Sequence, residues 1–154
     1  NSNNLVKLQS DMTIYAKVSD LSRISTVFRF GAGHIFSNHY EYFQALTLGA
    51  NNYLRGFRKD RFSGSSMAYS SAELRYKLFK SKSKILPGDV GVMGFFDIGR
   101  VWQKNEASKS WHNSTGGGIY FVPFNIIMLS AAVGISEEDR LFNFTLGTKF
   151  NITF

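Results

Sequence analysis

The last segment of the chain alternates between apolar and polar side chains almost without exception. One face would carry Phe142, Phe144, Leu146, Thr148, Phe150, Ile152 and Phe154. Alternation with a period of two places successive side chains on opposite faces of a β-strand. This row runs for about fourteen residues, whereas strands of globular proteins usually have about five or six. A single apolar row of this length is typical of a membrane-spanning strand.

The same alternation recurs along the chain, and no convincing amphipathic helix interrupts it. It predicts seven strands, at residues 5–18, 23–35, 66–79, 89–102, 113–122, 125–136 and 141–154. The strand at 113–122 is the least regular, because it contains three consecutive glycines. The side chains expected to face lipid are Phe28, Phe30, Leu74, Phe96, Ile98, Leu129, Val133, Phe144 and Leu146.

The connections between these strands have two lengths. Residues 19–22 and 123–124 are tight turns, whereas 36–65 and 103–112 are long. Short turns at one end and long loops at the other are the asymmetry of outer-membrane barrels. Two connections fit this asymmetry less well. The one at 80–88 is long for the end of the barrel that has short turns, and the one at 137–140 is short for the end that has long loops.

The predicted fold is therefore an all-β, antiparallel transmembrane barrel. The chain contains no run of about 18 apolar residues, which excludes a transmembrane helix. Its mean hydropathy of −0.14 does not argue against a membrane, because alternating strands give only a weak hydropathy signal. Trp102 and several tyrosines are expected near the membrane interfaces.

Seven strands cannot close a bacterial single-chain barrel, since such barrels have even strand counts starting at eight. Two explanations stay open. A short strand could be hidden between Tyr42 and Leu48, or further barrel strands precede this chain in a longer protein. We favour the second. The chain opens with Asn1-Ser2-Asn3-Asn4 and shows no signal peptide, so either a leader has been removed or the chain is a C-terminal piece.

Charge and composition indicate neither nucleic-acid binding nor catalysis. The net charge is +7, but the basic residues are spread singly along strands, which fits a solvated lumen or anionic lipid head groups. The chain has no cysteine. His34, His39 and His112 lack metal-site spacing, and the serines at 63–66 have no adjacent base in the sequence. We predict no catalytic residue, no metal and no cofactor.

Two motifs carry more specific information. Gly49-Ala50 precedes Leu54-Arg55-Gly56-Phe57 within the long 36–65 segment. Farther along, Phe96-Asp97-Ile98-Gly99-Arg100-Val101-Trp102 places an acid on the polar face of a predicted strand, and Glu73 has the same parity on the strand before it. A buried arginine is tolerable only when a carboxylate neutralises it.

From about residue 20 to its end, the chain resembles the C-terminal barrel half of the bacterial surface antigen superfamily, which includes BamA, TamA and the two-partner secretion transporters. The family's sixth extracellular loop carries a Gly-Gly stretch and then Val/Leu-Arg-Gly-Phe/Tyr. Its next strand offers an acid, the following one carries Phe-x-Asp-x-Gly-x-Val-Trp, and the last strand ends in an aromatic residue. Ala50 departs from the Gly-Gly pattern. The amino-acid sequences of the motifs are most similar to those of Bacteroidota members.

The resemblance implies a sixteen-stranded barrel in the bacterial outer membrane. It implies that the 36–65 loop folds into the lumen, where Arg55 meets Asp97 and Glu73. Gly56 would let the backbone approach the wall, and Phe57 would pack against apolar lumen residues such as Phe95 or Met93. Phe150 and Phe154 are candidates for a C-terminal assembly signal, with simple packing against lipid as the alternative.

The implied function is insertion or export of β-rich client proteins, without covalent chemistry. The implied partners are outer-membrane lipid or lipopolysaccharide, the preceding part of the barrel and the clients, with no nucleic acid. Two alternatives stay open. One is a membrane anchor for an N-terminal patatin-like lipase or metallophosphoesterase, and the other is a passive structural barrel.

Overall fold

The computed structural model describes residues 6–17, 23–37, 41–50, 54–103 and 110–148. Within these residues the protein is all-β, apart from one 3₁₀ turn, η1 (Tyr42–Gln44). The strands are β1 (Lys7–Lys17), β2 (Ile24–Ile35), β3 (Leu46–Leu48), β4 (Phe62–Gly64), β5 (Ser66–Ser81), β6 (Gly88–Trp102), β7 (His112–Pro123), β8 (Ile127–Ser136) and β9 (Arg140–Thr148). The predicted assembly-signal residues Phe150 and Phe154 lie outside the described part of the chain.

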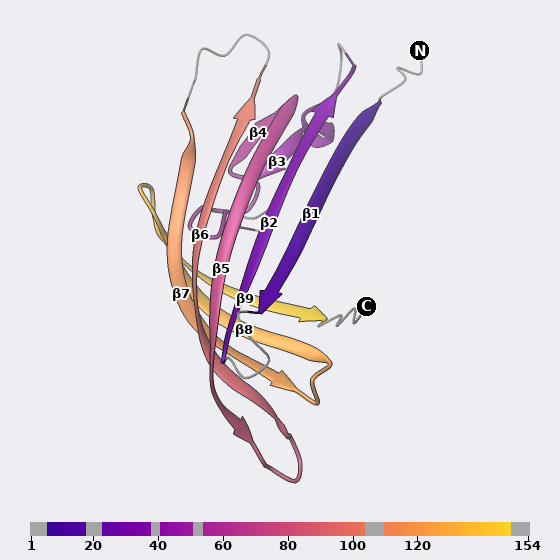
Figure 1. Ribbon diagram of the computed structural model, residues 1–154. Helices are drawn as coiled ribbons and strands as arrows, with labels where there is room; N and C mark the ends of the chain where they lie inside the picture. Colours follow the sequence, from indigo (N-terminus) through magenta and orange to yellow (C-terminus); the bar gives the residue numbers. More distant parts are fainter. Residues whose placement is uncertain (1–5, 18–22, 38–40, 51–53, 104–109, 149–154) are drawn as a thin grey trace.

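Seven of these strands form one sheet in the order β1-β2-β5-β6-β7-β8-β9, and every neighbouring pair is antiparallel (Figure 1). They coincide with the seven predicted strands to within about two residues at the described ends. A short strand does occur between Tyr42 and Leu48. It is β3, which pairs only with β4 and adds no strand to the main sheet.

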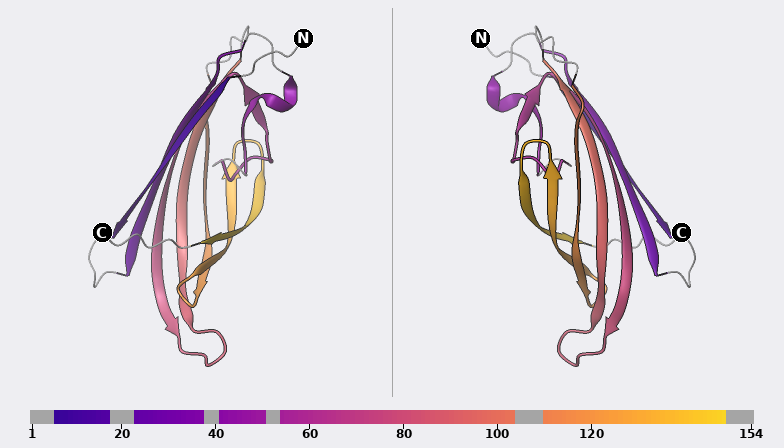
Figure 2. Two further views of the ribbon diagram at one scale, coloured as in Figure 1. Left: turned by 90° about the vertical axis from the view of Figure 1, so that its right-hand side faces the viewer. Right: turned by 90° about the vertical axis from the view of Figure 1, so that its left-hand side faces the viewer.

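The two faces of the sheet differ as the alternation predicted. Of the nine side chains expected to face lipid, eight are exposed on one face and Ile98 is half-buried. The opposite, concave face receives the segment that contains η1, β3 and β4, and β8 and β9 curve around this segment from the other side (Figure 2). The protein's own chain covers part of the concave face, although β1 is exposed throughout. The convex face keeps its exposed apolar side chains, which fits contact with an external apolar medium.

Three glycines on the concave face lie directly opposite an aromatic residue of the next strand. The pairs are Gly31 with Tyr69, Gly91 with Tyr120, and Phe95 with Gly116. A Cβ atom added at any of these glycines would come within 2.5 or 2.6 Å of the partner's ring or hydroxyl. Each aromatic side chain therefore lies over the backbone of the neighbouring strand, where a side chain would otherwise stand.

A tight turn and a β-bulge shape the end of the sheet away from η1. Phe124 and Asn125 both have positive φ values, of 53° and 59°, and the N–H of Ile126 donates to the carbonyl of Pro123. Positive φ at both central residues is the mark of the tight type I′ hairpin turn. A β-bulge between Lys77 and Phe79 shifts the β5–β6 register, so that Leu78 and Phe79 are both exposed.

No helix among the described residues is long and apolar enough to cross a membrane.

Candidate functional site

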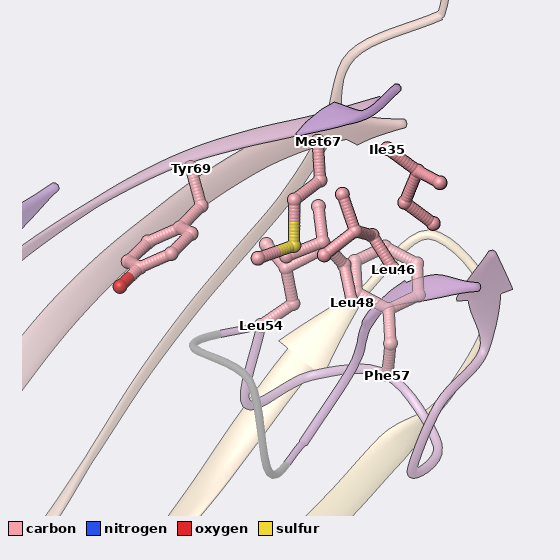
Figure 3. Close-up of a cluster of buried hydrophobic side chains, with 7 residues drawn as sticks. All are labelled: Ile35, Leu46, Leu48, Leu54, Phe57, Met67 and Tyr69. Atoms are coloured by element: carbon pink, nitrogen blue, oxygen red, sulfur yellow. The ribbon is translucent and has the colours of Figure 1, made fainter. Parts of the chain in front are cut away.

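The segment between β2 and β5 is held on the concave face by an apolar cluster. Leu54 and Phe57 are completely buried there beside Leu46 and Leu48 of β3. Ile35, Met67 and Tyr69 contribute from β2 and β5 (Figure 3). In the close-up, the Met67 side chain extends from β5 toward the leucines of the loop. Leu54 and Phe57 enclose Arg55 and Gly56 in sequence, so their burial draws these residues against the sheet.

Arg55 lies across β5 and β6 and contacts a carboxylate on each strand. Its Nε and Nη2 donate to Oδ2 and Oδ1 of Asp97 at 2.9 and 2.8 Å. Its Nη1 donates to Oε2 of Glu73 at 2.5 Å. The guanidinium carbon also lies 3.5 Å from the centroid of the Phe95 ring. The planar fork is thus paired with Asp97 in a bidentate manner and stacked on an aromatic face, a geometry that lysine cannot reproduce.

The carboxylates of this cluster are themselves held by neighbours on the sheet. Asp97 is fully buried and accepts a hydrogen bond from Oγ of Ser71 at 2.7 Å. Glu73 accepts a second one from Nε of Arg75 at 2.6 Å. We call Arg55, Ser71, Glu73 and Asp97 the Arg55 cluster. Burial alone would lower the pKa of Arg55, but the carboxylates of Asp97 and Glu73 outweigh it and raise that pKa above its ordinary value.

The backbone around Arg55 is fixed as firmly as its side chain. Its N–H donates to Oδ2 of Asp97 at 3.1 Å, and its carbonyl accepts from Nδ2 of Asn143 on β9 at 2.8 Å. The next carbonyl, of Gly56, accepts from Oγ of Ser136 at 2.8 Å. At Gly134 on β8, an added Cβ would collide with the carbonyl group of Arg55. The loop is therefore bonded to both walls of the curved sheet.

The three residues predicted to anchor the loop, Arg55, Glu73 and Asp97, come together. Gly56 packs as expected, since a Cβ there would lie 2.5 Å from that of Ser114 and 2.9 Å from the Ile135 backbone. At Gly49, an added Cβ would collide with the carbonyl of Arg58. Phe57 packs with Met67 and Tyr69 of the concave face, but the two examples expected for it, Phe95 and Met93, belong to a separate apolar cluster. The guanidinium of Arg55 covers Phe95, and Phe57 points toward the β3–β4 hairpin instead.

This geometry agrees with an independent comparison of the whole sequence. Residues 1–150 match the model of the Omp85 superfamily domain. The chain belongs to the Omp85 superfamily. No individual curated protein matches it in a sequence search. Omp85 proteins are outer-membrane barrels that act as transporters or assembly factors, and the seven-stranded antiparallel sheet is consistent with part of such a barrel.

A second set of contacts, which the sequence did not reveal, ties this Omp85 loop to the β8–β9 turn. Arg61 donates from Nε and Nη2 to the two carboxylate oxygens of Glu138 at 2.8 and 3.0 Å. Arg58 lies 3.6 Å from Asp139. Beside them, His112 of β7 stacks on Phe62 with the ring centroids 3.8 Å apart. Arg61 and Glu138 are 77 positions apart, and single charged residues in turns give no signal of such a contact.

The serines at 63–66 have no adjacent base in the sequence, but the fold brings a distant one to Ser66. Nδ1 of His34 lies 2.7 Å from Oγ of Ser66, because the two residues are paired across β2 and β5. The ring of His34 also contacts Phe36. Within the described residues no carboxylate bonds to this imidazole, so the third member of a hydrolytic triad is missing there. The described residues likewise contain no cluster of three or more His, Cys, Asp or Glu residues that could hold a metal ion.

Proposed function

We propose that the chain is the C-terminal part of a sixteen-stranded outer-membrane barrel that inserts or exports β-rich client proteins. The observation that carries the proposal is the Arg55 cluster, in which one loop arginine is fixed by carboxylates of two adjacent strands. Membership of the Omp85 superfamily supports the membrane location and the class of activity. Family membership does not identify the client proteins or an origin in Bacteroidota. Both stay predictions.

The geometry suggests what the loop contributes. In a barrel built from this sheet, the concave face is the lumen, and the described loop residues at 41–50 and 54–65 are inside it. Loops of this length are usually functional or disordered, and this one is ordered by buried ion pairs, backbone hydrogen bonds and an apolar cluster. A fixed loop gives the lumen a defined surface next to β8 and β9. This role requires binding and positioning only, so we assign no catalytic residue.

The convex face and the chain's end complete the proposal. The convex apolar side chains, such as Phe144 and Leu146, are assigned to the hydrocarbon of the outer membrane. The proposed partners are outer-membrane phospholipid or lipopolysaccharide, the preceding barrel strands and the client proteins. Phe150 and Phe154 are proposed as part of the signal that directs this chain's own insertion. Deleting Phe154 should then lower insertion in cells more than it lowers stability after refolding in detergent.

The test replaces Arg55 with alanine in the full-length protein and measures client proteins in the outer membrane. Arg55→Ala should lower client levels, while the variant's own strand content, measured by circular dichroism, stays unchanged. Arg58→Ala is the matched control, since Arg58 lies three residues away with most of its side chain in solvent. Arg55→Lys should restore the clients only in part, because an ammonium lacks the planar fork.

The outcomes separate the candidate functions. Normal client levels in Arg55→Ala would contradict an assembly or export role for the loop. If the barrel nevertheless retained an upstream enzyme domain at the membrane, the anchor alternative would replace the proposal.

A further inference from the structure

The end of the sheet opposite η1 carries an unusual concentration of positive charge. The β5–β6 hairpin extends beyond the other turns at this end (Figures 1 and 2). Its sequence, Lys80-Ser81-Lys82-Ser83-Lys84-Ile85-Leu86-Pro87, contains three lysines and no acid. All three lysines are exposed, and none of them has an acidic partner among the described residues. This hairpin is the connection that is too long for an ordinary barrel turn.

The nearest acid does not neutralise these lysines. Asp89 lies across from Lys80 in the β5–β6 register, but its carboxylate is contacted by Lys77 at 3.5 Å. Arg23, immediately before β2, adds another positive charge beside the hairpin, since its Nη1 donates to the carbonyl of Leu78. The end of the hairpin thus has a net positive charge without an internal counterion in the described structure.

Exposed apolar side chains stand next to the lysines. Ile85 is 81 % exposed at the tip of the hairpin. The β7–β8 turn lies beside it, because the N–H of Phe124 donates to the carbonyl of Pro87 at 2.8 Å. That turn presents Phe124 and Ile126, both more than half exposed. We call Lys80, Lys82, Lys84, Ile85, Phe124 and Ile126 the hairpin-end surface.

We propose that the hairpin-end surface binds the anionic head groups of the membrane leaflet at this end of the barrel. A cluster of lysines beside exposed aliphatic and aromatic side chains matches the boundary between head groups and acyl chains. Lysines near an anionic leaflet are attracted to it, and this attraction is screened by salt. A solvent-exposed acidic protein would satisfy the lysines but would leave Ile85 and Ile126 without an apolar medium.

This inference rests on the chain being part of a membrane barrel and is independent of any client. The experiment attaches an environment-sensitive fluorophore at Ile85→Cys, which creates the only cysteine within these 154 residues. Any cysteine elsewhere in the full-length protein is first replaced by serine. The labelled protein is placed in lipid nanodiscs of phosphatidylcholine alone, or of phosphatidylcholine mixed with phosphatidylglycerol. The variant to compare is Lys80→Gln/Lys82→Gln/Lys84→Gln.

Relative to the labelled protein in detergent, the emission should shift to the blue in nanodiscs that contain phosphatidylglycerol. The triple glutamine variant should lose most of that shift. Raising the salt from about 0.1 M to about 1 M should reduce the shift, because the screening length falls from about 10 to about 3 Å. The matched control removes three exposed charges elsewhere, by Lys7→Gln/Lys59→Gln/Arg140→Gln, and should keep the shift. Circular dichroism checks that each variant retains its strands.

Three results would overturn the proposal. An equal shift in nanodiscs of phosphatidylcholine alone would mean that the apolar tip inserts without recognising charge. No shift in either lipid would place the hairpin in water. A shift that the triple glutamine variant keeps in full would mean that the lysines do not contribute to binding. None of these readouts depends on client assembly, so Arg55→Ala should leave the lipid-dependent shift intact.

Discussion

Two arginines fasten the same loop, and both meet a carboxylate with two parallel hydrogen bonds, yet their surroundings differ. Arg55 is 13 % exposed and its partner Asp97 is fully buried. Arg61 and Glu138 are 48 % and 37 % exposed. In the second pair, water and salt compete for the same charges, and two long side chains lose conformational freedom. Solvent reaches the Arg55 cluster much less. Once the loop leaves, Asp97 loses its only cationic partner among the described residues, whereas Glu73 keeps Arg75.

The difference indicates a division of roles along the loop. A buried pair stabilises mainly because losing one partner leaves an uncompensated charge, which makes the bound position of the loop nearly all-or-none. An exposed pair changes the equilibrium only slightly and can break and re-form. We therefore expect the Arg55 end to determine whether the loop is docked, and the Arg61 end to restrict how far its outer part moves.

The largest expected effect comes from removing the fully buried carboxylate. Asp97→Ala leaves Glu73 as the one carboxylate that contacts the Arg55 side chain among the described residues, and it removes the acceptor of the Arg55 N–H. Loss of a partner from a buried pair costs about 3–5 kcal/mol, so the undocked loop should become at least about a hundredfold more populated. Limited digestion with a lysine-specific protease measures this at the exposed Lys59. An unchanged cleavage rate there would remove the distinction between the two pairs.

An arginine introduced without any carboxylate tests the opposite situation. Leu146 lies on the convex face, and Leu146→Arg should destabilise the barrel by about 2–4 kcal/mol if the site is near the middle of the bilayer. The neighbouring Thr145 has the opposite parity, so Thr145→Arg should be much milder. Unfolding of both variants in lipid vesicles gives the two free energies. Equal values would show that the convex face does not meet hydrocarbon.

A smaller effect is expected from the backbone contact made by β9. Asn143→Ala removes the donor to the Arg55 carbonyl and leaves that oxygen part-buried without the amide. Leaving a buried polar group unsatisfied costs about 1–3 kcal/mol. The cleavage rate at Lys59 should therefore rise less than in Asp97→Ala. Thr145→Ala on the same strand is the control, and a rise as large in that variant would mean that β9 as a whole has loosened.

The smallest effect is expected at the exposed pair. Arg61→Ala should change loop docking by no more than about 1 kcal/mol, and the change should vanish at high salt because exposed charges are screened. Proteolysis at low and high salt, with Glu138→Ala as the reciprocal variant, measures this. A larger, salt-independent loss would mean that the stacking of Phe62 on His112 depends on the pair.

The sequence predicted more of the sheet than of the loop. Alternation places Phe144 and Asn143 on opposite faces whatever the register of the strand, so the strands and their apolar side could be derived locally. Arg55, Glu73 and Asp97 could be grouped because the motifs resemble a known family and the two acids share a parity. Neither argument needed the three-dimensional path of the chain.

The contacts that depend on that path were missed or misplaced. Asn143 and Ser136 reach the loop only because β8 and β9 curve around it, and a lone polar residue on a polar face gives no hint of this. Phe57 was expected to pack against apolar lumen residues, with Phe95 and Met93 as examples. The guanidinium of Arg55 stacks on the Phe95 ring and occupies that contact. Phe57 therefore packs against the leucines of β3.

The glycines that face aromatic rings on the concave side have an evolutionary consequence. A side chain at position 31, 91 or 116 cannot coexist with the ring opposite it, so none of these glycines can be replaced while that ring is present. Among relatives, positions 31 and 69 should co-vary, because the three atoms nearest to a Cβ at Gly31 all belong to Tyr69. Positions 91 and 116 should stay glycine whatever residue lies opposite, because a Cβ there would also collide with the backbone oxygens of Tyr76 and Val133.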